Sequence, residues 1–259
     1  MATRTPTSAA SPQPAQAEPS APVPAPIAAP AGPLALLREV PAFLKRPAIL
    51  KPMGLRAGAG WAALGVLSGL HVAVLLLVVL PLIGLWQQAM HLPAPDAFDR
   101  LPTGWLLPIT VLIAPIAEET VFRGWQSGRP RALWLLLCGV LFAGLAVSAR
   151  ALAPLALLGA LVALALAALG GWLVLRRRQA AAVCRAAFPM IFWIAALVFA
   201  AFHLMNYPRV SAAMLPMVLP QLWAGLMLGF TRQRIGLPAA MLQHMAANAA
   251  TMVLVQLGG

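Results

Sequence analysis

The chain has 259 residues, of which 61% are hydrophobic and only 9% are charged, and its mean hydropathy is +0.86. Because soluble domains carry roughly 25% charged residues, this composition excludes an ordinary soluble domain. Lys and Arg outnumber Asp and Glu by 18 to 6, but the basic residues cluster between apolar runs, which favours a membrane-surface signal over nucleic-acid binding. The expected fold class is all-α, a polytopic transmembrane helix bundle.

Two segments precede the first long apolar run. Residues 1–34 are built largely from Ala, Pro, Ser and Gln, a composition that predicts a disordered Pro/Ala-rich cytoplasmic tail. Residues 35–60 carry several basic side chains and are predicted to form a basic interfacial segment at the inner leaflet. The transmembrane helical domain is then expected over residues 61–259.

About seven apolar runs, within a range of six to eight, are long enough to cross a bilayer, which takes about 20 residues. They lie near 61–86, 103–123, 132–149, 151–175, 188–206, 213–230 and 236–257. Placing the amino terminus in the cytoplasm leaves only Arg100, Arg150 and Arg209 of the basic residues between the spans outside, so the positive-inside rule predicts this orientation. The helix pair near 132–175 has no ionisable group in its interior and is interpreted as bilayer-facing.

Two glutamates stand together at membrane depth in "IAPIAEETVFRGW". A charged side chain there costs on the order of 2.5–3.5 kcal/mol, so Glu118 and Glu119 need partners or a task. Glu119 and Arg123 are four residues apart and share a helix face, which predicts an ion pair and leaves Glu118 for chemistry. The alternative is a structural ion pair beside a solvated neighbour.

Two of the four histidines belong to short polar motifs inside later spans. His203 follows Phe199 by one helical turn in "FAAFH", and His244 precedes Asn248 by one turn in "HMAAN". Polar side chains on an apolar helix must point into the bundle, because lipid offers them no hydrogen bonds. Helix-packing contacts remain the alternative for both motifs, and His71 in the first span is predicted to be a packing histidine.

The ordered set of motifs "EETVFR", "FAAFH" and "HMAAN" resembles the signatures EExxxR, FxxxH and HxxxN of the CAAX protease and bacteriocin-processing family of intramembrane proteases, the type II CAAX prenyl endopeptidase-like group. The resemblance covers roughly residues 103–257. It implies that the domain over 61–259 is protease-like.

The resemblance also implies roles for individual residues. Glu118 would be the general base on water, with His203 helping to hold that water, and His244 and Asn248 would stabilise the oxyanion. Glu119 belongs to the same catalytic set. Arg123 would support it by holding Glu119, and Phe199 by orienting His203.

Metal use is left open by the sequence. Glu118, His203 and His244 are donors that Zn²⁺ accepts, and the family is often described as a metalloprotease group. The HExxH pattern is absent, however, and the three donors would come from three separate helices.

Two departures from the family pattern concern spacing and depth. Glu118 and His203 are 85 positions apart, whereas the first two motifs usually fall on consecutive spans, so the helix pair near 132–175 is interpreted as an insertion. The expected boundaries also put Glu118 and His203 at depths that differ by more than ~10 Å, at ~1.5 Å per helical residue. Either the second helix starts deeper and carries "FRGW" within the protein, or the fifth helix begins later.

The leading functional hypothesis is an intramembrane endopeptidase that acts on a protein or peptide substrate in the membrane. The Ala-, Pro- and Arg-rich composition suggests a bacterial inner-membrane protein, with no nucleic-acid partner. The alternatives are a non-proteolytic relative that acts as a membrane scaffold or immunity protein, and a proton-coupled transporter that uses Glu118, His203 and His244 as a relay.

Overall fold

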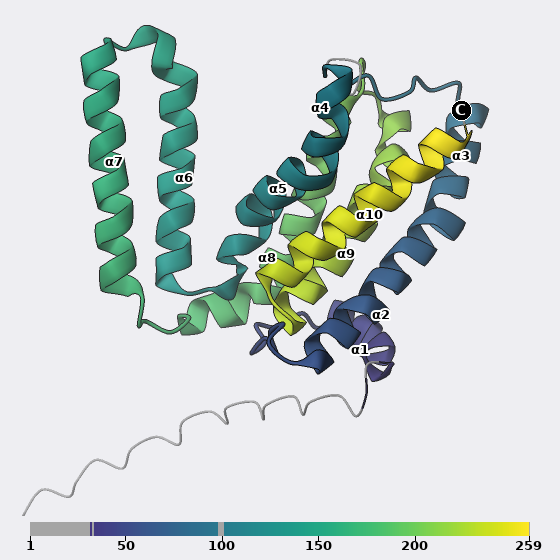
Figure 1. Ribbon diagram of the computed structural model, residues 1–259, viewed down its shortest axis with the longest axis horizontal. Helices are drawn as coiled ribbons and strands as arrows, with labels where there is room; N and C mark the ends of the chain where they lie inside the picture. Colours follow the sequence, from purple (N-terminus) through teal and green to yellow (C-terminus); the bar gives the residue numbers. More distant parts are fainter. Residues whose placement is uncertain (1–31, 33, 98–100, 259) are drawn as a thin grey trace, which may run out of the picture.

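The computed structural model describes residue 32 and residues 34–97 and 101–258, so nearly all of the predicted tail lies outside the described residues. The described part is helical and contains no strand (Figure 1), which confirms the predicted fold class. Its α-helices are α1 (Ala35–Lys45), α2 (Gly58–Val74), α3 (Leu80–Ala89), α4 (Thr103–Leu107), α5 (Ala114–Arg123), α6 (Pro130–Ser148), α7 (Pro154–Leu175), α8 (Ala182–Phe202), α9 (Leu219–Arg234) and α10 (Leu237–Gly258).

Six helical stretches of the described chain are long and apolar enough to cross a membrane. They are Gly58–Ala89, Gly104–Ser127, Pro130–Ala151, Pro154–Leu175, Ala182–Asn206 and Ala212–Arg234. These correspond in order to the first six predicted spans. The seventh predicted span is α10, whose polar residues Gln243 and His244 lower its hydropathy and are buried inside the bundle.

Helix α1 packs across the start of the bundle through one apolar face. Leu36, Val40 and Phe43 recur at helical spacing and are buried, and the ring of Phe43 lies 5.3 Å from that of Phe192 in an edge-on contact. Arg38 on the opposite face is exposed. The first half of the predicted interfacial segment is therefore an amphipathic helix with its basic side outward.

The second span is interrupted in a way that frees one backbone carbonyl. Between α4 and α5 the chain forms a π-helical turn over Pro108–Ile113, in which the N–H of Ala114 bonds to the carbonyl of Ile109. The next donor in this i+5 series would be Pro115, which has no N–H, so the carbonyl of Thr110 loses its partner in the helix. Asn248 on α10 replaces that partner, with a 2.8 Å bond from its Nδ2 to the Thr110 oxygen.

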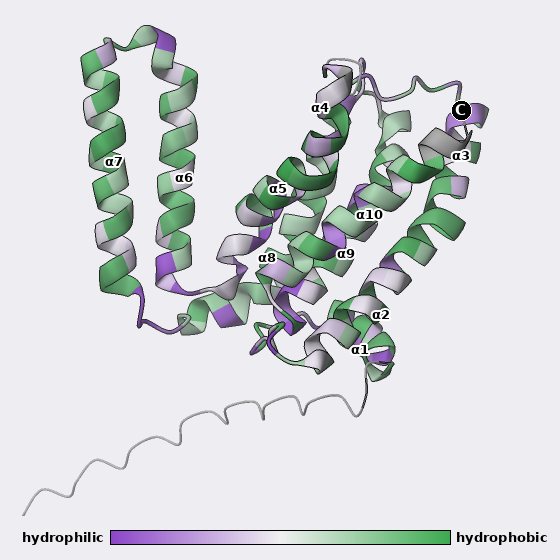
Figure 2. Ribbon diagram, in the orientation of Figure 1, coloured by the Kyte–Doolittle hydropathy of each residue, from purple (hydrophilic) through white to green (hydrophobic). Residues whose placement is uncertain are grey.

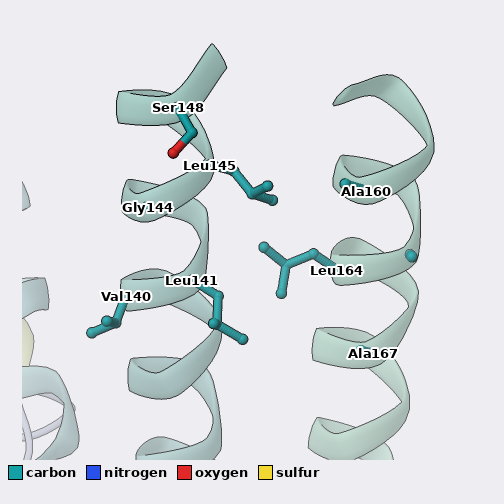
Figure 3. A pocket seen from close by; sticks show the side chains of 9 residues that line it. Val140, Leu141, Gly144, Leu145, Ser148, Ala160, Leu164 and Ala167 are labelled. Atoms are coloured by element: carbon teal, nitrogen blue, oxygen red, sulfur yellow. The ribbon is translucent and has the colours of Figure 1, made fainter. Parts of the chain in front are cut away.

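Helices α6 and α7 form a hairpin that stands away from the other helices (Figure 1). Both are apolar along most of their length (Figure 2), and α7 has no buried residue. They meet closely where Trp134 packs on Gly171, since a Cβ there would lie 2.1 Å from the indole nitrogen. Elsewhere they leave a cavity of about 750 Å³, into which Leu145 and Leu164 project (Figure 3).

Helix α8 begins earlier than the predicted fifth span, at Ala182 instead of residue 188. Its first turns leave the foot of the hairpin at a steep angle to the long helices (Figure 1), and Pro189 lies within it. A start of the fifth helix later than residue 188, which is one of the two explanations offered for the mismatch in depth, is therefore contradicted. The early residues are helical because they are Ala-rich, and they run under the bundle before α8 passes beside α5.

Candidate active site

Glu119 is the centre of a buried polar cluster on α5 and α10. Its side chain has no exposed surface, and its Oε1 accepts hydrogen bonds from Nη1 of Arg123 at 2.8 Å and from Nδ1 of His244 at 3.0 Å. The ion pair that the i,i+4 spacing predicts is thus present. The charge of the buried carboxylate is thus compensated by a cationic partner and a second donor, both at Oε1, while Oε2 is buried without a hydrogen bond to a described residue.

Glu118 is in a different environment although it is the preceding residue. Its side chain is 30% exposed, it forms no hydrogen bond with any described residue, and its Oε2 lies 3.8 Å from Nε2 of His244. That separation is longer than a direct hydrogen bond. His244 therefore lies between the two carboxylates, with Nδ1 toward Glu119 and Nε2 toward Glu118.

Phe199 joins the motif on α8 to this cluster. The Arg123 guanidinium carbon lies 3.9 Å from the centre of the Phe199 ring, a cation–π contact, and the same ring contacts His203 at 4.9 Å and His244 at 6.0 Å, both edge-on. The Nδ1 of His203 bonds to the Phe199 carbonyl at 2.9 Å. Because a carbonyl only accepts, Nδ1 carries the hydrogen and the neutral ring presents Nε2 as an acceptor.

His203 lies at the end of α8 and is within the electrostatic reach of Glu118, Arg123 and His244. The expected mismatch in depth is therefore absent. The part of the first explanation that carries "FRGW" within the protein is observed, because the helix continues through Gly124–Ser127 and both Arg123 and Gln126 are buried.

Asn248 lies one turn beyond His244 on α10. One hydrogen of its side-chain amide is used by the bond to the Thr110 carbonyl, and the second remains available. The structure thus brings together six predicted site residues directly and places the seventh at their edge. The six are Glu118, Glu119, Arg123, Phe199, His203 and His244.

Two neighbours of the cluster are not singled out by the sequence motifs. Phe122 packs edge-on against Phe199, with 5.2 Å between ring centres. Gln243 donates to the Leu67 carbonyl at 3.2 Å and lies 3.4 Å from Nδ1 of His71, which is fully buried. His71 is therefore a packed histidine of the first span, as predicted, and its position next to Gln243 links that span to α10.

The donors proposed for Zn²⁺ do not form a ligand set here. Among the described residues, no group of three or more His, Cys, Asp or Glu side chains is arranged to hold a metal ion. The Nδ1 bonds of His203 and His244, to a backbone carbonyl and to Glu119, are the contacts that a histidine ligand makes with its other ring nitrogen, and they leave Nε2 of each ring without a hydrogen bond to a described residue. The chemistry of the three side chains is thus compatible with a metal ion, whereas their positions, as they stand, are not those of a zinc site with three protein donors.

The fold and the cluster define a polytopic helical membrane protein with ionisable groups held at membrane depth. A sequence model of the type II CAAX prenyl endopeptidase Rce1-like family matches residues 100–188 and 184–250, which together span more than half of the chain. The chain belongs to this family, which is a family of proteases. No curated protein and no solved structure was found to match it.

Proposed function

We propose that the protein is an intramembrane endopeptidase that hydrolyses a peptide bond of a protein or peptide substrate, with Glu118 as the general base. The observation that supports this most is the contrast between adjacent carboxylates. Glu119 is neutralised by Arg123 and His244, whereas Glu118 is partly exposed and lacks a hydrogen bond to any described residue. A base must reach water and substrate, and of the two carboxylates only Glu118 does so.

The chemistry requires one proton to move twice. Glu118 takes a proton from water as the water oxygen bonds to the substrate carbonyl carbon, which places a negative charge on the carbonyl oxygen. Glu118 then delivers that proton to the leaving nitrogen as the C–N bond breaks. The acceptor Nε2 of His203 would help to orient the water, and the free amide hydrogen of Asn248 would stabilise the oxyanion. His244 would add a second donor when its ring carries a proton on Nε2 as well as the one that Nδ1 donates to Glu119.

Contacts between the helices support these roles because they hold the site side chains in fixed positions. Phe199 holds the His203 ring and Arg123 at once, and Glu119 holds His244 by its Nδ1. A base and its neighbours held in one geometry lose little entropy on reaching the transition state. The protein would be inserted in a bacterial inner membrane with its amino terminus in the cytoplasm.

The test compares the peptide ends found in membranes that contain the wild type, Glu118→Gln or Thr120→Ala. Glu118→Gln removes the base while keeping the side chain's size, and general-base catalysis is worth about 10²- to 10⁴-fold, so products of the protein should fall by at least ~100-fold. Thr120 lies on the same helix, is exposed and bonds only to the Ile116 carbonyl, so Thr120→Ala should leave the products unchanged.

Two other results would replace this proposal. If no peptide end depends on Glu118 although the variant is inserted and folded, the scaffold or immunity role takes its place. If proton uptake into vesicles depends on Glu118 while no peptide end depends on it, the proton-coupled transporter role takes the place of the protease role.

A further inference from the structure

A second pocket lies at one membrane surface, beside the end of the span that carries the buried polar cluster. It has a volume of about 660 Å³ and is formed where the span Gly104–Ser127 ends, where α6 and α8 begin, and where α9 ends, with Ile49–Pro52 beside it. All of these are ends of spans on the same side of the bundle. The pocket is therefore at the depth of lipid headgroups and not of their acyl chains.

The lining of this pocket is strongly basic. Its charged residues are Lys51, Arg129, Arg131, Arg185 and Arg232. It contains no Asp or Glu, and none of the five basic side chains forms an ion pair with a described carboxylate. Like charges gathered in one concave site that has no carboxylate in its lining repel each other, and a bound anion would reduce that repulsion.

Three of the arginines are held in place by backbone carbonyls. Arg232 donates from Nε to the Arg123 carbonyl at 3.1 Å, Arg131 donates to the Arg176 carbonyl at 3.4 Å, and Arg185 donates to the Ala180 carbonyl. Each bond uses only part of a guanidinium group, which has five N–H donors. The arginines are thus positioned before any ligand arrives, and Arg232 is within electrostatic reach of Arg129, which repels it, and of Glu119, which attracts it.

The geometry points to a phosphate group as the ligand: we propose that this pocket binds the headgroup phosphate of an anionic phospholipid. The guanidinium fork matches phosphate oxygens in pairs, and the amino-terminal turn of α6, which carries Arg131, adds the positive end of a helix dipole. The apolar residues Ile49 and Leu50 line the same pocket and would contact the glycerol and upper acyl carbons. Basic pockets between spans at a membrane surface have this chemistry.

The test measures lipid binding to the full-length protein, purified in a neutral detergent and freed of lipid, by native mass spectrometry. Phosphatidic acid, phosphatidylcholine and inorganic phosphate are the probes. The pocket variant is Arg129→Gln with Arg185→Gln, and its matched control is Arg177→Gln with Arg178→Gln, which removes the same charge from exposed residues outside the pocket.

We expect the wild type and the control to bind one phosphatidic acid at least ~10-fold more tightly than phosphatidylcholine, and the pocket variant to lose that preference, because each surface arginine contributes appreciably to anionic lipid binding. Arg129→Lys with Arg185→Lys, which keeps the charge but not the fork, should bind with intermediate affinity. This second variant provides the test if the first fails to fold.

Three results would overturn the inference. The first is equal affinity of the wild type for the two lipids. The second is an equal loss of the preference for phosphatidic acid in the pocket variant and in the control, which would indicate that lipid binding depends on the general surface charge and not on the pocket. The third is displacement of phosphatidic acid by inorganic phosphate at a similar concentration, which would make free phosphate the ligand in place of a lipid.

Discussion

Glu118 and Glu119 show how far two adjacent residues can differ once the chain is folded. A helix turns by about 100° per residue, so Glu119 points into the interface of α5 and α10, where Arg123 and His244 meet it, while Glu118 points toward a more open space. The buried carboxylate organises the site. The open one is proposed to perform the chemistry.

Replacing Glu119 should therefore damage the fold more than replacing Glu118. Glu119→Ala leaves the Arg123 charge buried and His244 without its acceptor, and breaking a buried pair in this way costs about 3–5 kcal/mol of unfolding free energy. Denaturation of the detergent-solubilised variants measures this change. Glu118→Ala is the control and should cost less than about 1 kcal/mol, because Glu118 has no hydrogen bond to a described residue. Equal destabilisation by both substitutions would contradict the assignment.

At the scale of the element, the second span depends on its partner helix. Pro115 removes the donor that would reach the Thr110 carbonyl, and Asn248 supplies a substitute from α10. The break in one helix is thus satisfied by a side chain of another, as is usual for irregular backbone at membrane depth. The same bond fixes the position of α5 against the helix that carries His244.

The loss of stability on removing the bond from Asn248 to the Thr110 carbonyl should be smaller when residue 115 has a backbone N–H that can replace it. Asn248→Ala leaves the Thr110 carbonyl unpaired and should cost about 1–3 kcal/mol of unfolding free energy. In a Pro115→Ala background residue 115 has an N–H, so the cost of Asn248→Ala should fall, which a double-mutant cycle of unfolding free energies measures.

Activity in the same four proteins separates two roles of Asn248. If it also stabilises the oxyanion, cleavage stays low in the double variant although stability returns. An Asn248→Ala cost that is the same in both backgrounds would show that the carbonyl of Thr110 does not depend on Pro115.

At the scale of the whole molecule, the helices divide into a packed bundle and a separate hairpin. The bundle of α2, α5, α8, α9 and α10 contains the buried polar residues, whereas α6 and α7 face outward almost everywhere. The larger cavity belongs to the hairpin and is lined by apolar side chains, so it does not mark the proposed site of chemistry. The hairpin also explains the long separation between the first two motifs, and an insertion remains our interpretation of it.

The orientation of the whole molecule can be checked with single cysteines. In a background where Cys138 and Cys184 are replaced by Ser, Ala94→Cys lies in the loop after α3 and Gln179→Cys in the loop before α8, and both positions are exposed. The positive-inside rule predicts that a membrane-impermeant maleimide labels Ala94→Cys in intact cells and Gln179→Cys only after lysis. The reverse pattern of labelling would contradict the predicted orientation.

Composition and local spacing in the sequence were enough to determine the helical membrane class, the first six spans within a few residues, and the pairing of Glu119 with Arg123. These follow from hydropathy over about 20 residues and from the 3.6-residue helical period, both of which act within one segment. The three motifs also indicated the candidate site residues, because ionisable groups are costly in a membrane interior and are therefore placed there for a structural or functional reason.

Only the tertiary structure decided how those residues meet. The place of His244 between two carboxylates, the contact of Phe199 with both histidines and Arg123, and the bond from Asn248 to a carbonyl freed by Pro115 all join separate helices. The steep course of the first turns of α8 (Figure 1) and the position of His203 near Glu118 likewise depend on packing between helices. The tilt, neighbours and relative depth of apolar spans are set by side-chain packing within the folded bundle. Hydropathy patterns are similar from one apolar span to the next, so they do not predict these features.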